Sequence, residues 1–231
     1  MNLKRIIGVI ISTLFLIGAG ISQTPTNAVY GILLDNTGSL RPELPAVKAV
    51  GKEIVGQASS SGNISIFSFS TVKRDDLTLA EIGVGGAWSR DQRILFDEVE
   101  SLQTVEGQTA LFDAIYSVAE KVDSRANVGQ GAPLKKIVII VSDGQDRKSE
   151  VKLKELFTYL EQKNIKVHAL GLVSSLSAEG GYVGESPRTR AVNFLKKITK
   201  KTGGRLIIPK PEQTVEDAVK ALLADESKET K

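Results

Sequence analysis

The sequence predicts an α/β protein with a doubly wound, mostly parallel sheet and helices on both faces. Short apolar runs rich in Ile and Val alternate along the chain with segments whose apolar residues recur every three or four positions. Most of these runs are continuous, which is typical of strands that are covered on both faces. Strands that alternate with helices imply right-handed crossover connections, and such connections build a parallel sheet.

Six apolar runs are expected to form the strands of this sheet. Five of them are short and mostly continuous, at residues 29–34, 64–69, 136–141, 165–172 and 205–208. The sixth, at residues 76–82, places Leu77, Leu79 and Ile82 among polar residues. This pattern suits an edge strand with one face in solvent.

Helical periodicity predicts six helices between these runs. Their apolar stripes lie within residues 44–58, 89–102, 111–122, 153–160, 194–198 and 215–222. In the second helix, the residues expected to face the core are Ile94, Leu95, Val99 and Leu102. The fifth helix is followed by Gly203-Gly204, a pair that indicates a helix stop.

The first residues of the chain have the pattern of a secretory leader. Lys4 and Arg5 precede an apolar stretch at residues 6–21, and cleavage is expected after Ser22. The alternative is an uncleaved membrane anchor, although a stretch of 16 residues is short for a span of about 20. We therefore expect an exported protein, periplasmic or extracellular, which contacts the membrane only if its leader is retained.

Length and composition suit a single domain. The 231 residues are 41% hydrophobic and 25% charged, an ordinary balance for a globular protein. We expect a leader, one large domain and a charged tail, at residues 1–22, 28–223 and 224–231 respectively.

Charge and cysteine content exclude several classes of function. The formal net charge is only +3, and Lys and Arg are dispersed among acidic residues, so the sequence shows no nucleic-acid footprint. The absence of cysteine excludes disulfides, thiolate metal sites and a cysteine nucleophile. A domain of this size buries an adequate core without them.

Two short segments look like halves of one cation site. Asp35, Thr37 and Ser39 form a D-x-T-x-S motif directly after the first apolar run, and Ser142-Asp143-Gly144 directly follows the apolar run that ends at Val141. The carboxyl ends of neighbouring parallel strands meet at the crevice where open α/β sheets bind ligands. Thr109, just before the third helix, adds a hydroxyl from another loop. Hard divalent cations such as Mg²⁺ prefer oxygen ligands of this kind.

The charge of this candidate site favours a contact with a partner over catalysis. A divalent ion brings two positive charges, which Asp35 and Asp143 cancel formally. Helix N-termini near Ser39 and Thr109 then add partial positive charge. Because Mg²⁺ demands six oxygen ligands, an anionic oxygen from outside would complete both coordination and charge. A Glu or Asp side chain of a partner protein is the natural candidate.

The motif residues resemble the von Willebrand factor A domain family, whose metal-ion-dependent adhesion site reads D-x-S-x-S, then a threonine, then an aspartate. The resemblance covers about residues 28–223 and assigns the metal site to Asp35, Thr37, Ser39, Thr109 and Asp143. It implies a doubly wound sheet and Mg²⁺- or Mn²⁺-dependent binding of an acidic residue on a partner. It also implies that the Thr37 and Ser39 hydroxyls ligate directly, that the two aspartates act partly through water, and that Thr109 engages depending on state.

One residue departs from the family pattern, and it leaves an alternative open. Thr37 stands where the family usually has serine, which keeps the hydroxyl but adds a methyl group and stiffens χ1. We expect cation binding to survive with altered affinity or geometry. The alternative is a metal-free structural or interaction domain that keeps the motif as a network of hydrogen-bonded turns.

An enzyme is not expected. Ser39 has no histidine or lysine near it in sequence, and the chain contains no G-x-S-x-G nucleophile motif. Two carboxylates around one metal also occur in phosphoryl-transfer sites, so a metal-dependent phosphoester hydrolase is a further alternative. The nucleophile or basic clamp that such a site needs cannot be located in this sequence.

Three other polar residues are expected to have structural roles. Asp146 is predicted to help cap a helix that begins near Ser149. Asp113, one turn into the third helix, is predicted to offset the helix dipole. His168 lies in an apolar run and has no second histidine to act with, so we expect it to be buried and hydrogen-bonded.

Overall fold

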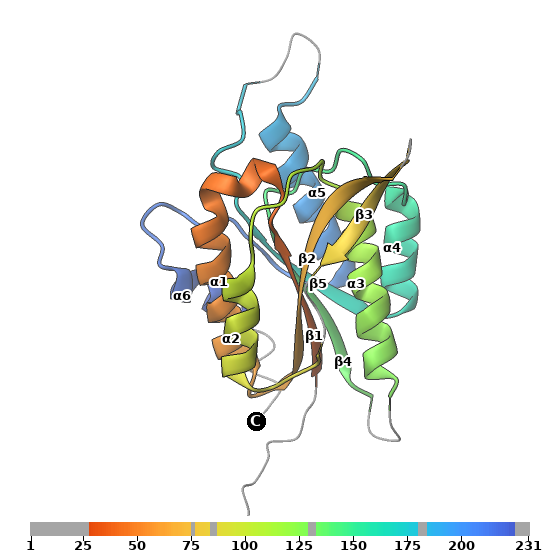
Figure 1. Cartoon of the computed structure of the whole chain (residues 1–231), viewed down its shortest axis with the longest axis vertical. Helices are drawn as coiled ribbons and strands as arrows, with labels where there is room; N and C mark the ends of the chain where they lie inside the picture. Colours follow the sequence, from red (N-terminus) through yellow and green to blue (C-terminus); the bar gives the residue numbers. More distant parts are fainter. Residues whose placement is uncertain (1–27, 75–76, 84–86, 129–132, 180–183, 225–231) are drawn as a thin grey trace, which may run out of the picture.

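The computed structural model describes residues 28–74, 77–83, 87–128, 133–179 and 184–224 (Figure 1). The predicted leader at residues 1–22 lies outside the described residues, as does the predicted tail beyond residue 224. In the described part of the chain, no helix combines the length and the apolar character that crossing a bilayer requires.

Within these residues, one sheet has six strands in the order β3-β2-β1-β4-β5-β6. All neighbouring strands pair in parallel except β3, which pairs antiparallel with β2 at the edge of the sheet. The strands are β1 Ala28–Asp35, β2 Gly62–Arg74, β3 Leu77–Gly83, β4 Lys135–Ser142, β5 Ile165–Gly171 and β6 Leu206–Ile207. The predicted fold class is confirmed, and so is the edge strand expected at residues 76–82.

Helices cover both faces of the sheet (Figure 1). α1 (Leu44–Ala58), α2 (Gln92–Ser101) and α6 (Val215–Leu223) build one hydrophobic core with the sheet. α3 (Leu111–Ala126), α4 (Leu153–Gln162) and α5 (Pro187–Thr202) build a second core on the opposite face. A short 3-10 helix, η1 (Gly38–Glu43), leads from β1 into α1. Strand order reverses between β1 and β4, which marks the crevice between their carboxyl ends as the switch point of the sheet.

β1 is buried along its whole length because it sits in the middle of the sheet. Tyr30, Ile32 and Leu34 point into the core of α1, α2 and α6, while Val29 and Leu33 point into the opposite core. This double burial explains why its sequence is continuously apolar rather than alternating.

Gly31 allows α3 to lie directly against β1. A Cβ atom at this position would come within 2.6 Å of Val118 Cγ1 and 2.7 Å of Val122 Cγ2. Both contacts are too short for real carbon atoms, so the spacing between β1 and α3 depends on glycine.

The sequence prediction for the second helix is wrong at Ile94. Its side chain is 47% exposed, whereas Leu95, Val99 and Leu102 are buried as expected. The helix begins at Gln92 because the Asp91 side chain accepts a hydrogen bond from the Arg93 backbone and caps it. Leu95 and Val99 then share the inner face, and Ile94, one position earlier, is rotated about 100° from Leu95 toward solvent.

The predicted helix stop at Gly203-Gly204 is confirmed and has two physical causes. Gly203 has a left-handed backbone with φ of 74°, the usual geometry after a helix end. At Gly204, a Cβ atom would lie only 1.9 Å from the carbonyl oxygen of Val167. The glycine pair therefore both ends α5 and lets the chain pass close to β5.

Candidate metal centre

The ends of β1 and β4 bring the two predicted aspartates to one edge of the sheet. The two strands pair in parallel up to Leu34 opposite Val141. Asp35 is the next residue of β1, and Ser142 and Asp143 are the next residues after Val141. Asp35 is fully buried and Asp143 is 1% exposed, so both carboxyl groups are removed from bulk water.

Four of the five predicted ligands are linked by hydrogen bonds. The Thr37 hydroxyl donates to Asp35 Oδ1 over 2.7 Å, and the Thr109 hydroxyl donates to Thr37 Oγ1 over 3.4 Å. Ser39 Oγ lies 3.3 Å from Thr37 Oγ1. Since a hydroxyl has a single proton and Thr37 gives its proton to Asp35, Ser39 acts as the donor in this contact. The two loops thus meet through their hydroxyl oxygens.

Asp143, the fifth predicted ligand, lies beside this network without a described hydrogen bond to it. Its carboxylate accepts hydrogen bonds from the Gln145 backbone at 2.9 Å and from Gln145 Nε2 at 3.1 Å. Gly144 provides the turn, with φ of 77°. The negative charge of Asp143 nevertheless reaches Asp35 and contributes to raising its pKa.

Ser142 is a part of the site that sequence reasoning missed. Its hydroxyl donates a 2.6 Å hydrogen bond to Asp35 Oδ2 and accepts one from the Gly144 backbone at 3.0 Å. The sequence motif contained this serine, but without the register of β1 and β4 nothing indicated that it faces Asp35. A hydroxyl residue one position before the second aspartate, at the end of a strand that neighbours the first aspartate, is the signal that could have identified it.

Burial and mutual repulsion make the crevice electrostatically unfavourable for two ionised carboxylates. The pKa of Asp35 is raised to about 6, first because the group is buried and second because of the charge on Asp143. Hydrogen bonds from Ser142 and Thr37 lower it and only partly offset these effects. A cation between the two aspartates would relieve both the burial penalty and the repulsion.

Backbone hydrogen bonds hold the loops of the site in place. Val105 N donates to the carbonyl oxygen of Asn36 at 3.0 Å, and Asn36 Nδ2 donates to the carbonyl oxygen of Gln103 at 2.7 Å. The carbonyl oxygen of Thr109 accepts hydrogen bonds from Arg147 N and Lys148 N at 2.9 and 3.2 Å. The first loop is thereby tied to the second, and the second to the third.

Asp146 caps a different helix from the one predicted. Together with Ser149, it accepts a hydrogen bond from the Phe112 backbone in the first turn of α3, whereas α4 begins only at Leu153. Asp113 in turn accepts from the backbone of the loop before α4, at residues 150 and 151. The prediction failed because a helix cap can come from a residue distant in sequence. The reciprocal hydrogen bonds of Asp146 and Asp113 also hold the loop after Asp143 against the start of α3.

His168 has the buried, hydrogen-bonded role expected of it. It is 1% exposed within β5, and its Nδ1 accepts a hydrogen bond from the Arg205 backbone at 3.2 Å. This contact helps to join β5 to the segment that enters β6.

The donor set at the crevice fits a hard divalent cation. It consists of two buried carboxylates and several hydroxyls, all of them oxygen ligands of the kind that Mg²⁺ and Mn²⁺ accept. Among the described residues, no group of three His, Cys, Asp or Glu side chains could hold a metal ion. A cation here would therefore depend on hydroxyls and water, and the raised pKa of Asp35 is consistent with a site designed for added positive charge.

Known proteins with the same fold support this reading of the architecture. An aerotolerance-related membrane protein from Bacteroides fragilis NCTC 9343 aligns with a TM-score of 0.60 and 15% identity, over 87% of this chain and 99% of that one. A von Willebrand factor type A structure from Catenulispora acidiphila has a TM-score of 0.57 and 16% identity, over 86% and 42%. Proximal thread matrix protein 1 from the mussel byssus has a TM-score of 0.59 and 15% identity, over 87% and 47%. This chain therefore spans less than half of the last two proteins.

The sequence itself gives the family. A comparison with curated protein sequences finds no match. The family model described as the von Willebrand factor type A domain, however, matches residues 31–219, which is most of the chain and includes every residue of the candidate site. Together with the doubly wound sheet, this match shows that the chain belongs to the von Willebrand factor type A domain family.

Proposed function

We propose that this domain binds a protein partner through one Mg²⁺ or Mn²⁺ ion, held at the crevice by Asp35, Thr37, Ser39, Thr109 and Asp143. Members of the family generally mediate protein–protein interactions, often through a metal-dependent adhesion site. In this proposal, an acidic side chain of the partner completes the coordination of the ion. When bound, the ion supplies a positive charge at the rim of the sheet that attracts such a carboxylate.

The observation that carries the proposal is the pairing of two buried carboxylates with the hydroxyls of Thr37, Ser39 and Thr109. Asp35 and Asp143 balance a divalent ion formally. α3 begins at Leu111, so its N-terminus adds partial positive charge close to Thr109. The assembled site is then short of negative charge, which favours an anionic group from outside.

The proposed ligands differ in burial, and this suits their different roles. Thr37 and Thr109 are 1% and 3% exposed, whereas Ser39 is exposed at the opening of the crevice. In the proposal, the Thr37 and Ser39 hydroxyls ligate directly and the aspartates act partly through water. Ser142 orients Asp35 through its 2.6 Å hydrogen bond.

A metal-free interaction domain is the second candidate. It is favoured by the fact that the hydroxyls of Thr37 and Ser142 already satisfy both oxygens of Asp35 without an ion. Family members are generally interaction modules rather than enzymes. A metal-dependent phosphoester hydrolase is therefore a less favoured alternative, which release of phosphate from a simple ester in the presence of Mg²⁺ would support.

We further propose that the domain at residues 28–223 works outside the cytoplasm. The support for export is the leader pattern at residues 1–22, in which two basic residues precede an apolar stretch. A retained leader would anchor the domain in the membrane.

Thermal unfolding with and without Mg²⁺ or Mn²⁺ tests the cation site. Binding should add about 2.7 kcal/mol of stability at a hundredfold excess over the dissociation constant. Thr37→Ser should keep this response, since it restores the usual family residue, and Thr37→Val should lose it. Thr199→Val is a matched control, because Thr199 is equally buried but donates its hydroxyl to the carbonyl oxygen of Leu195 in α5.

The outcomes separate the candidates. A stability gain in the wild type and the Thr199→Val variant, but not in Thr37→Val, supports the cation site. No gain in any of them favours the metal-free domain. Capture of a partner from the natural source with and without chelator then tests the adhesive role, which predicts loss of the partner when the cation is removed.

A further inference from the structure

We propose that the solvent-facing side of α5 docks on the anionic phospholipid headgroups of a membrane. This surface, the α5 basic face, consists of Arg188, Arg190, Lys196, Lys197, Lys200 and Lys201, all of them exposed. The inference does not depend on the cation site, which lies at the carboxyl edge of the sheet.

The expectation that Lys and Arg are dispersed among acidic residues is wrong for the segment that forms α5. α5 carries six basic residues and no acidic residue in 16 positions. Its buried side packs against the sheet through Ala191, Leu195 and Ile198, so the basic side chains are left on the outside. They include the pairs Lys196–Lys200 and Lys197–Lys201, each one helical turn apart on the same side of the helix.

This arrangement destabilises the helix that carries it. Like charges four residues apart repel each other, and the arginines at 188 and 190 lie in the first turn, where the helix dipole disfavours positive charge. The helix dipole therefore explains only the presence of the last-turn lysines, Lys200 and Lys201. Binding of an external anion would explain the other basic residues of this face.

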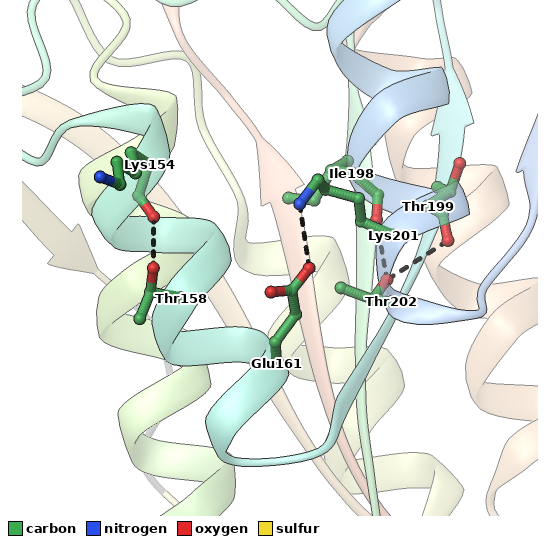
Figure 2. Close-up of polar contacts among 7 residues, drawn as sticks. All are labelled: Lys154, Thr158, Glu161, Ile198, Thr199, Lys201 and Thr202. Carbon is green, nitrogen blue, oxygen red and sulfur yellow. Dashed lines mark hydrogen bonds and ion pairs between the residues drawn. The ribbon is translucent and has the colours of Figure 1, made fainter.

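Some of the positive charge is already partnered within the fold. Lys201 forms a 3.1 Å ion pair with Glu161 of α4 (Figure 2). Nζ of Lys201 and Nζ of Lys197 lie 5.2 and 5.5 Å from the ring centroid of Phe157. Among the described residues, by contrast, Lys196 and Lys200 have no ion-pair partner. These two lysines are the centre of the free charge.

A groove extends the basic face onto α4. It runs between the two helices and is lined by Lys154 and Thr158 of α4, with Lys197 and Lys201 on the α5 side and Phe157 between them. Figure 2 shows Lys154 and Thr158 on α4 and Lys201 on α5. With three ammonium groups and only Glu161 opposing them, the groove suits an anionic headgroup.

The absence of apolar anchors favours a lipid surface over a protein partner. Protein interfaces depend on buried aromatic and aliphatic residues at their centre. The large hydrophobic residues that are exposed in the described part of the chain are Ile94, Val105, Val128 and Val215, and none lies on α5. A basic surface without such anchors is what anionic membranes attract.

The position of the leader agrees with this assignment. Its apolar stretch ends six residues before β1 begins at Ala28. Six extended residues reach at most about 20 Å. A retained leader would therefore keep the domain close enough to a bilayer for α5 to contact it.

Flotation of the full chain with vesicles tests the proposal. Vesicles of phosphatidylcholine are compared with vesicles that also contain phosphatidylglycerol, in the presence of chelator so that no divalent cation bridges protein and phosphate. Because the leader is present in every variant, differences between variants report on α5. The test variant is Lys196→Gln with Lys200→Gln, and the control is Lys210→Gln with Lys220→Gln, two exposed lysines outside α5.

We expect the test variant to lose about fivefold in partition to the anionic vesicles for each lysine removed, and the control to change by less than about twofold. The melting temperature of the test variant should change little, because the repulsion between Lys196 and Lys200 is removed together with the favourable last-turn charge of Lys200. An equal loss in the control, or no loss in the test variant, would overturn the proposal. Binding of each variant to polyglutamate is measured in parallel. If the test variant loses this binding but keeps its partition to the anionic vesicles, the proposal is overturned and the face is assigned to an acidic protein.

Discussion

Ser142 Oγ donates a 2.6 Å hydrogen bond to Asp35 Oδ2 across the junction of β4 and β1. This contact lowers the pKa of Asp35 against the opposing effects of burial and of the Asp143 charge. It also connects the two strand ends that carry the proposed cation ligands. The hydroxyl thus orients the central carboxylate and favours its ionised form.

Removal of this hydroxyl should weaken the site. Ser142→Ala leaves Asp35 Oδ2 and the Gly144 backbone without a described partner, so we expect a loss of about 1–3 kcal/mol in stability. Mg²⁺ affinity, measured by calorimetric titration, should fall about tenfold or more. Ser65→Ala is the matched control: Ser65 is also buried, but its hydroxyl has no hydrogen-bond partner among the described residues. Unchanged affinity in Ser142→Ala would contradict the assigned role.

The charge of Asp143 should have opposite effects on stability and on cation binding. Asp143→Asn removes the repulsion that raises the pKa of Asp35, so the cation-free protein should be no less stable than the wild type above the pKa of about 6. Its thermal response to Mg²⁺ should disappear. Asp146→Asn provides the contrast, since it weakens the cap of α3 and should lower stability while the Mg²⁺ response persists.

Asp123 should contribute stability that depends on pH. Burial raises the pKa of Asp123, but hydrogen bonds from Lys136 at 2.9 Å and from Lys163 at 3.2 Å outweigh it, and the pKa lies below its usual value. The unfolded chain therefore binds the proton more readily in acid. This stabilisation is complete above the unfolded pKa and is lost as pH falls through the folded pKa.

The corresponding variant is Asp123→Asn, which should cost about 1–3 kcal/mol at neutral pH, measured by denaturant unfolding. The difference from wild type should shrink below about pH 4. Glu161→Gln removes the exposed pair with Lys201 and should cost less than about 1 kcal/mol. A difference for Asp123→Asn that stays constant down to strong acid would refute the ion-pair explanation.

Gly31 should tolerate no side chain. Gly31→Ala places a Cβ atom 2.6 Å from Val118 Cγ1, and the branched valine cannot turn away easily, so we expect a loss of about 1–3 kcal/mol. Gly56→Ala is the control in α1, where nothing lies within 4 Å of the added atom. It should stabilise the protein by about 0.5–1 kcal/mol. Equal effects of the two changes on the unfolding midpoint would show that packing against α3 is not the cause.

Periodicity was enough to predict the sheet, because most of its strands are buried on both faces. The run at 29–34 is continuously apolar since β1 contacts both cores, and the mixed run at 76–82 is indeed the antiparallel edge. Ile94 was placed wrongly because neighbouring helix positions differ in direction by about 100°, so Ile94 and Leu95 cannot both face the core. Leu95 and Val99, four positions apart, share the buried face, and Ile94 is left exposed.

The part of the candidate site that lies directly at the ends of predicted strands could be predicted from the sequence. Asp35 ends β1 and Thr37 follows two positions later, and the topology brings Thr109 to them. The contacts of Ser142 and Asp146 were harder to predict, because their partners Asp35 and Phe112 are 107 and 34 positions away. For Ser142, the available signal was its place at the end of a strand expected to neighbour Asp35. Hydrogen bonds between distant loops leave no periodic trace in a sequence.

The backbone hydrogen bonds at Thr109 have a consequence for how fast the proposed partner would bind. Its carbonyl oxygen is held by Arg147 N and Lys148 N, and Asn36 is fastened to Val105 in the same way. If the crevice binds a partner carboxylate as proposed, this hydrogen-bonded backbone needs little rearrangement, so little conformational entropy is lost on binding. Association should then be governed by diffusion and electrostatic attraction, and differences between partners should appear mainly in how long they stay bound.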